Sequence, residues 1–314
     1  MILLMGLIGV ILLLLFNYLF KQTEWYKKQS EDAIKFKNIL TNLQTVNLGS
    51  NNGKYSLDYT NIGCNGMNWA VGPQAICFDY KILKTFIHKI KKGGSLIIVI
   101  SPFHSILDKF VDKNANDKYY LFLPKELIPD YSKLRHLKAR INHHFPLFFL
   151  IRNPRLIFHI IRKNKATYNL TYNPMNQSQL IADANKWMQG WKKQFNIKNL
   201  EASLPANVLK IQKDNRKVLT DIIELCRAHQ LQPLIVLPPI TQYLLKHLTT
   251  NLRQMYIYNF LDEVIQKTGI KLLDYMDDER FSNPDLYFNS FFLNQRGRRE
   301  FTQIVLKDIH SSIN

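Results

Sequence analysis

Ser95–Ile100, with the sequence S-L-I-I-V-I, is an unbroken apolar run near the middle of the N-terminal half. A strand without polar alternation is buried on both faces, which happens chiefly in parallel sheets that carry helices on both sides. Shorter apolar runs occur at Thr45–Leu48, Leu234–Leu237 and Ile270–Leu273. The chain is therefore expected to build a doubly covered α/β sheet.

Helical periodicity separates these runs. Apolar side chains recur at helical spacing in Phe78–Lys92, Asn215–His229 and Tyr256–Thr268, and a last helix is expected to run through about His310. Tyr59–Ile62 reads as a further strand. Strands that alternate with helices predict about five parallel strands in one α/β domain.

Two of the expected strands end in loops of small polar residues. Gly49–Gly53 follows the first, and a loop with Gly63, Asn65 and Gly66 follows the second. Such loops at the carboxyl edge of a parallel sheet are where α/β proteins build their sites. Ordinary turns use the same residues, so the pattern alone leaves both interpretations open.

Met1–Phe20 contains no charged residue and is long enough to span a bilayer core. A cleaved signal peptide would begin with basic residues and end in small ones, so an uncleaved anchor is favoured. Lys21, Lys27 and Lys28 follow this segment, and the positive-inside rule alone would keep the large domain in the cytoplasm. Long domains are exported regardless of flanking charge, which leaves the orientation open.

The chain carries 42 Lys and Arg against 24 Asp and Glu, a net charge of +18. This excess predicts attraction to anionic lipid or an anionic envelope polymer. Nucleic acid ranks last among the anionic partners and is not expected, because the sequence has none of the nucleic-acid-binding signatures. Three cysteines and scattered histidines form no metal-binding motif, so neither a metal nor another cofactor is expected.

Residues 131–182 contain no acidic residue, and basic residues flank aromatic-rich apolar runs that are too short to span a membrane. Arg152, Arg155, Arg162 and Lys163 are expected to dock this insertion on a membrane surface or a membrane partner. The alternative is an insertion that packs its apolar face on the domain and leaves its charges in water. The expected organisation is an anchor at 1–20, a juxtamembrane linker at 21–44 and a domain at 45–314.

Several short motifs occur in a particular order. They are N-L-G-S near the first strand, a Gly-x-Asn turn after the second, L-P-P after a late strand, and N-P-D-L-Y-F followed by L-N-x-x-G-x-x-x-F-T near the end. In order and spacing they resemble the SGNH hydrolases, and most closely their membrane-anchored DltD-like relatives. The resemblance covers about Thr45 to Asp308 except the basic insertion. It implies a flavodoxin-like, three-layer fold.

The resemblance also implies a serine nucleophile in a Gly-Asp/Ser-Ser turn and a C-terminal Asp-x-x-His pair, which together make a triad for acyl transfer. In this chain the nucleophile position is Asn51, and the acid and base positions are Asn289 and Phe292. An amide cannot act as an alkoxide, and a phenyl ring cannot carry a proton. Gly66 and Asn68 match the oxyanion-hole positions.

A rearranged site is the alternative. Ser50 would be the nucleophile, His104 its base, and Asp58 or Asp108 the group that orients the base. The simpler interpretation of His104 is a surface loop residue. Trp187 and Trp191, at i and i+4, are expected to be core rather than ligand-stacking residues.

The function expected from the resemblance is a non-catalytic, accessory or binding role in the modification or export of envelope polysaccharide or teichoic acid. The main domain would then lie outside the cytoplasm, beside an integral-membrane acyltransferase or export partner. The alternative is an active O-acyltransferase or esterase that uses Ser50. A third possibility is a structural adaptor whose cleft is filled by Phe291 and Phe292.

Overall fold

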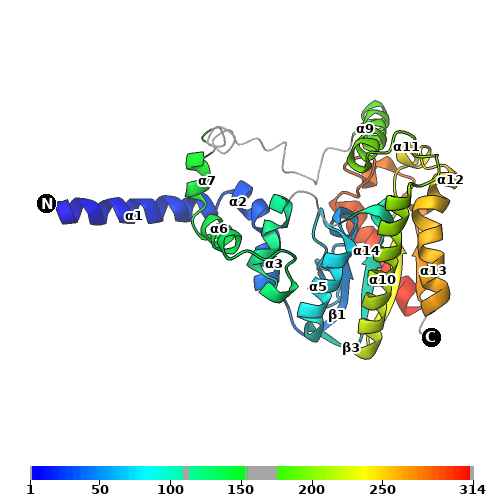
Figure 1. The fold of residues 1–314 in the computed structure, drawn as a ribbon, viewed down its shortest axis with the longest axis horizontal. Helices are drawn as coiled ribbons and strands as arrows, with labels where there is room; N and C mark the ends of the chain where they lie inside the picture. Colours follow the sequence, from blue (N-terminus) through cyan, green and yellow to red (C-terminus); the bar gives the residue numbers. More distant parts are fainter. Residues whose placement is uncertain (1, 109–112, 153, 155–174, 312–314) are drawn as a thin grey trace. The chain divides into compact units, whose positions relative to one another are not determined.

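The computed structural model describes residues 2–108, 113–152, 154 and 175–311 (Figure 1). The chain divides into two compact units: residues 1–39 with 112–169, and residues 40–111 with 170–314. The expected linker at 21–44 and insertion at 131–182 therefore do not coincide with these boundaries. The larger unit resumes before α9 (Gln177–Phe195), a helix whose first residues fall inside the expected insertion.

The larger unit is built on a five-stranded, all-parallel sheet with the order β2-β1-β3-β4-β5. The register pairs Thr45 with Gly66, Leu48 with Ile98, and Val99 with Val236. The expectation of an α/β fold with about five parallel strands is confirmed. The strands are β1 (Leu43–Leu48), β2 (Gly66–Asn68), β3 (Ile90–Val99), β4 (Gln232–Leu237) and β5 (Lys271–Asp274).

Helices cover both faces of this sheet. On one face, α10 packs between α5 and α13 (Figure 1). On the other, α14 contributes Phe301 and Val305 to a buried cluster with Ile97, Val99 and Val236 of the central strands. Their neighbours in sequence, such as Ile98, are equally buried and face the opposite side, since successive side chains alternate along a strand. This double burial explains the absence of polar alternation in β3.

The helices of the larger unit continue the alternating pattern, with short turns where strands end. They are α4 (Asn51–Ser56), α5 (Ile76–Phe86), η1 (Ile87–Lys89), η2 (His104–Ile106), α9, α10 (Ala206–Ala228), α11 (Gln242–Leu245), α12 (Thr250–Arg253), the π-helical turn η6 (Gln254–Tyr258), α13 (Asn259–Thr268), η7 (Glu279–Phe281), η8 (Pro284–Leu286) and α14 (Gln295–His310).

Two expected elements are wrong. Tyr59–Ile62 is not a strand: the Asp58 carboxylate accepts a hydrogen bond from the Thr60 amide, and Asn61 has a φ of 60°, so the segment turns. The second strand is β2, a few residues later. The helix expected at Phe78–Lys92 ends at Phe86, and β3 already begins at Ile90.

The smaller unit begins with a helix, α1 (Ile2–Lys21), that is long and apolar enough to cross a membrane. Its other described elements are short. They are α2 (Glu24–Gln29), α3 (Glu31–Lys37), η3 (Lys113–Leu121), η4 (Lys125–Leu127), α6 (Lys133–His144) and α7 (Leu147–Arg152).

Polar contacts tie α6 to the carboxyl end of α1 and to α2 (Figure 1). The Asn17 side-chain amide donates to the His144 carbonyl at 2.9 Å, and the Tyr26 hydroxyl donates to the His143 carbonyl at 2.7 Å. Deeper in the same unit, Phe36 stacks on Phe122 with ring centroids 4.4 Å apart.

Candidate functional site

The loops that follow β1 and β3 meet over a small cavity of about 100 Å³. In the order 2-1-3-4-5, the connections that leave β1 and β3 diverge to opposite faces of the sheet, and ligand sites of α/β proteins form in the resulting crevice. The cavity is lined by Ser50, Asn51, Asn52, Pro73, Ser101, Pro102, Phe103, His104, Leu107, Trp187, Trp191, Gln194, Phe195, Phe291 and Phe292.

Ser50 sits directly after β1 on a backbone that requires glycine before it. Gly49 has a φ of 131°, and a Cβ there would lie 2.8 Å from the Val99 carbonyl oxygen. The Ser50 hydroxyl is buried and accepts a hydrogen bond from the Gln74 amide at 3.0 Å. The sequence thus places a serine at the cavity, with its oxygen already held by backbone.

Asp79 lies beneath this loop and was not foreseen from the sequence. Its Oδ1 accepts a hydrogen bond from the Gly49 amide at 2.9 Å and a second from the Gln74 side-chain amide. Burial, offset in part by these two donors, raises the pKa of Asp79 from 3.8 to about 7. The available signal was its position on α5, since Asp79 shares the apolar face of Ile82, Leu83 and Phe86.

His104 also lines the cavity, but it is a buried residue rather than a surface loop residue. Neither ring nitrogen has a hydrogen-bond partner of ordinary geometry, and an interaction with the Val99 backbone offsets the effect of burial on the His104 pKa only in part. Burial lowers the pKa of His104 from 6.5 to about 4. At neutral pH the ring is therefore an uncharged and weak base.

The structure brings Ser50 and His104 to the same cavity but shows no hydrogen bond between them. Neither carboxylate expected to orient the histidine lines that cavity. Asp58 accepts from the Thr60 amide and lies 3.7 Å from Arg299, and Asp108 is exposed.

The three triad-equivalent positions are used for packing and turn formation. Asn51 lines the cavity and lies against Gly72, where any Cβ would collide with its Oδ1. The Asn289 Oδ1 accepts hydrogen bonds from the Phe291 and Phe292 amides at 2.9 and 2.8 Å. Its oxygen therefore holds the local turn instead of a histidine.

Aromatic side chains line the cavity and pack against one another, and they are called here the aromatic cover. Phe292 contacts Trp187, and Phe291 contacts Trp191, with centroids 5.5 and 5.3 Å apart. Phe103, whose φ is 65°, lies 4.5 Å from Trp191. The two tryptophans of α9 were expected in the core, but they line the cavity, where they pack against other aromatic rings.

One carboxylate holds the loop that carries Phe291 and Phe292 in place through hydrogen bonds. Asp183 of α9 accepts hydrogen bonds from the Ser290 amide at 3.0 Å and the Ser290 hydroxyl at 2.5 Å. On the other side of the loop, the Thr241 hydroxyl donates to the Ser290 carbonyl at 2.8 Å. The loop that carries Phe291 and Phe292 is therefore held at both sides of Ser290.

The oxyanion-equivalent residues do not line the cavity. Gly66 opens β2, and a Cβ there would collide with the Tyr59 ring. The Asn68 Oδ1 accepts from Asn47 and from the Ala70 amide, and its Nδ2 donates to the Gly53 and Leu57 carbonyls at 2.9 Å. The Asn68 amide is fully engaged inside the fold.

The residues expected to dock the basic insertion cannot be placed. Arg152 closes α7, but its side chain is outside the described set, as are Arg155, Arg162 and Lys163. Among the described residues, no group of three His, Cys, Asp or Glu side chains converges in a way that would hold a metal ion.

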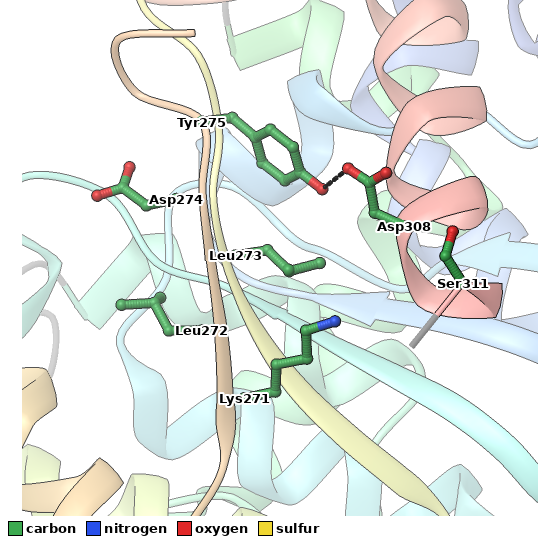
Figure 2. Close-up of a pocket in the computed structure, with 7 residues that line it drawn as sticks. All are labelled: Lys271, Leu272, Leu273, Asp274, Tyr275, Asp308 and Ser311. Atoms are coloured by element: carbon green, nitrogen blue, oxygen red, sulfur yellow. Dashed lines mark hydrogen bonds between the residues drawn. The ribbon is translucent and has the colours of Figure 1, made fainter. Parts of the chain in front are cut away.

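A second hollow, of about 370 Å³, lies along the edge strand β5 (Figure 2). Tyr275 donates a hydrogen bond to Asp308 of α14 at 2.8 Å on one wall of this hollow. Its remaining lining residues are Lys271, Leu272, Leu273, Asp274 and Ser311. It contains none of the residues singled out in the sequence.

Comparisons with known proteins do not assign the chain: no family model matches it, and no curated protein sequence matches it.

Proposed function

We propose that this chain is a membrane-anchored protein with a flavodoxin-like, SGNH-type fold that has lost its triad and serves as a non-catalytic component of envelope-polymer modification or export. The observation that carries the proposal is the fate of the triad-equivalent positions. Asn289 caps a turn, and Phe292 belongs to the aromatic cover of the cavity.

The small size of the cavity supports a structural rather than a catalytic role for this part of the protein. Sites for small-molecule ligands are usually about 300–1,000 Å³. The cavity over Ser50 measures about 100 Å³ and is lined by six aromatic side chains: Phe103, Trp187, Trp191, Phe195, Phe291 and Phe292. An acylated sugar unit would have to displace several of these rings to reach Ser50.

The anchor and the charge supply the rest of the proposal. α1 would hold the chain in the cell membrane as a single pass, with the larger unit outside the cytoplasm beside an integral-membrane acyltransferase or export partner. The excess of 18 positive charges suits an anionic envelope polymer or anionic lipid as a neighbour.

A fluorophosphonate probe tests the absence of a nucleophile. The full-length chain in mild detergent is incubated with the probe, beside the Ser50→Ala variant and an active serine esterase as the positive control. We expect no labelling of either form of the chain. Labelling of the parent that disappears in Ser50→Ala would contradict the proposal and identify a live serine.

The second candidate is an O-acyltransferase or esterase that uses Ser50. It is favoured by one observation, which is that Ser50 and His104 line the same cavity. For catalysis, the cover would have to open and His104 would have to reach the Ser50 hydroxyl, whose oxygen now accepts from the Gln74 amide.

A further inference from the structure

Helix α6 carries an apolar face that no described part of the protein covers. Leu134, Leu137 and Ile141 recur at i, i+3 and i+7 and so lie on one side of the helix. Phe145 and Phe148 follow at its end and at the start of α7. These five side chains, called here the α6 stripe, are between 40% and 76% exposed. A soluble surface rarely leaves such a row open without a partner.

Basic residues border the stripe. At 3.6 residues per turn, Lys138 falls on one side of it and Lys133 and Arg140 on the other. All three are exposed, and α6 contains no acidic residue. The side turned away from the stripe carries Ala139, which is buried, and His143, which packs on Tyr26 with centroids 6.0 Å apart.

Contacts with α1 determine where α6 and the start of α7 lie relative to the membrane boundary. Asn17 lies about one turn before the end of α1 at Lys21, and it bonds the carbonyl of His144, the last residue of α6. A 20-residue apolar helix spans about 30 Å, the thickness of the hydrocarbon core, so its last turn lies close to the boundary with water. Trp25 and Tyr26, aromatic residues typical of that boundary, follow immediately.

We propose that α6 and the start of α7 lie in the plane of the membrane, with the α6 stripe inserted at the boundary between head groups and acyl chains of an anionic bilayer. An amphipathic helix with an apolar stripe and basic borders binds such a surface through both its buried area and its charge. The inference rests on the proposed anchoring by α1 and adds a second membrane contact, held to the first by Asn17 and Tyr26.

The charge pattern favours lipid over a protein groove as the occupant. The carbonyl at the end of α6 is bonded to the last turn of α1, which the proposed anchoring places at the membrane boundary, and Lys133, Lys138 and Arg140 border the stripe on both sides. An anionic surface meets both borders at once.

The test places an environment-sensitive fluorophore on the stripe of the full-length chain in lipid nanodiscs, without any other protein. Cys64 and Cys77 are replaced by serine in every sample, since they are only partly buried, and Cys226 is buried. Leu137→Cys carries the label on the stripe, and Arg140→Cys carries it on the border as the matched control. Lipids with a nitroxide in the acyl chain serve as quenchers.

In anionic nanodiscs we expect several-fold stronger quenching of the label at 137 than of the label at 140. Neutral nanodiscs should weaken the quenching at 137. The combined changes Lys133→Gln, Lys138→Gln and Arg140→Gln should weaken it equally in anionic nanodiscs.

A label at 137 that stays in water in anionic nanodiscs would overturn the inference. Equal quenching of this label in anionic and neutral nanodiscs would overturn it as well. Alkaline carbonate extraction of the same full-length protein from vesicles tests the anchoring by α1 separately, because a membrane-spanning protein stays with the lipid. A chain that resists extraction while the label at 137 stays in water keeps its anchor and loses only the second contact. A chain that is extracted loses the proposed anchor itself.

Discussion

Asp79 and His104 are two buried titratable groups that face the loops of the cavity, and their pKa values move in opposite directions from their ordinary ranges. Burial disfavours the charged form of each group, which raises the pKa of an acid and lowers that of a base. Each group therefore couples the stability of the larger unit to pH, and each does so over its own pH range.

Asp79→Asn should change the pH dependence of stability between pH 4 and 8. The folded-state pKa of about 7 lies above the ordinary value of 3.8, so the native state binds the proton more tightly and loses stability as the pH rises through this range. For Asp79 the loss is about 2–3 kcal/mol between pH 5 and pH 8. The denaturation midpoint of the full-length chain in detergent should therefore fall less steeply with pH in the variant. Parallel curves for parent and variant would contradict this.

His104→Phe should stabilise the protein, most of all in acid. The folded-state pKa of about 4 lies below the ordinary 6.5, so protonation favours the unfolded chain as the pH falls from 6.5 towards 4. The effect is about 3 kcal/mol at its limit. Phenylalanine also removes two buried ring nitrogens that have no hydrogen bond. Thermal melts at pH 7.5 and pH 5 measure the gain, which should be larger at pH 5. A variant less stable than the parent at both pH values would show that the imidazole makes a favourable contact.

At the scale of elements, the loop that carries Phe291 and Phe292 depends on α9 for its position. Asp183 binds Ser290 through both its amide and its hydroxyl. Nothing else among the described contacts accepts a hydrogen bond from the Ser290 hydroxyl, so removal of the Asp183 carboxylate would leave that donor without its acceptor.

Asp183→Ala should loosen this loop at a cost of about 1–2 kcal/mol, because Asp183 is only partly buried. Hydrogen exchange followed by mass spectrometry should show faster exchange in the peptide that spans 288–293, with β3 unchanged. Asn185→Ala, on an exposed position of the same helix, is the control and should leave both peptides as in the parent. Equal exchange at 288–293 in all three proteins would mean that ring packing alone holds the loop.

The sequence predicts well those elements whose conformation is determined by one local feature, such as a continuous apolar run. The buried runs of β3 and β4 have no competing interpretation, and both are strands at the expected places. Tyr59–Ile62 also contains strand-favouring residues, but there the Asp58 carboxylate accepts a hydrogen bond from the Thr60 amide and the chain turns. The strand instead forms at Gly66–Asn68, where a Cβ on Gly66 would collide with Tyr59. That constraint is tertiary, so no local pattern reveals it.

The candidate site follows the same division. The position of Ser50 in a loop after the first strand is predictable, because glycine, serine and asparagine favour turns. The burial of His104 is not, since the turn that carries it packs against α10 and η6, which lie far along the chain. Asp79 could be recognised from its helical spacing, which places it on an apolar face, but its contacts with Gly49 and Gln74 are tertiary.

At the scale of the whole molecule, the orientation of the chain in the membrane remains the most consequential prediction. A phosphatase that folds only outside the cytoplasm, fused after Asn314, should be active if the larger unit is exported, as the SGNH resemblance implies. A reporter active only in the cytoplasm, fused at the same position, is the matched control. Activity of the cytoplasmic reporter alone would instead follow the basic residues Lys21, Lys27 and Lys28.

The smaller unit is made of two stretches of chain, and the time needed to synthesise the protein separates them. Asn17 meets its acceptor, the His144 carbonyl, only after 127 further residues. At about 5–20 residues per second, translation takes roughly 6–25 s to cover that distance. During this interval α1 has a buried polar group to satisfy without α6, and after Val99 is added the chain contains β1 and β3 but not yet β4 and β5. The nascent chain thus passes through a stage in which the edge of β3 is unpaired and α1 lacks its contact with α6. At this stage a chaperone or a membrane insertase has the largest exposed surface to bind.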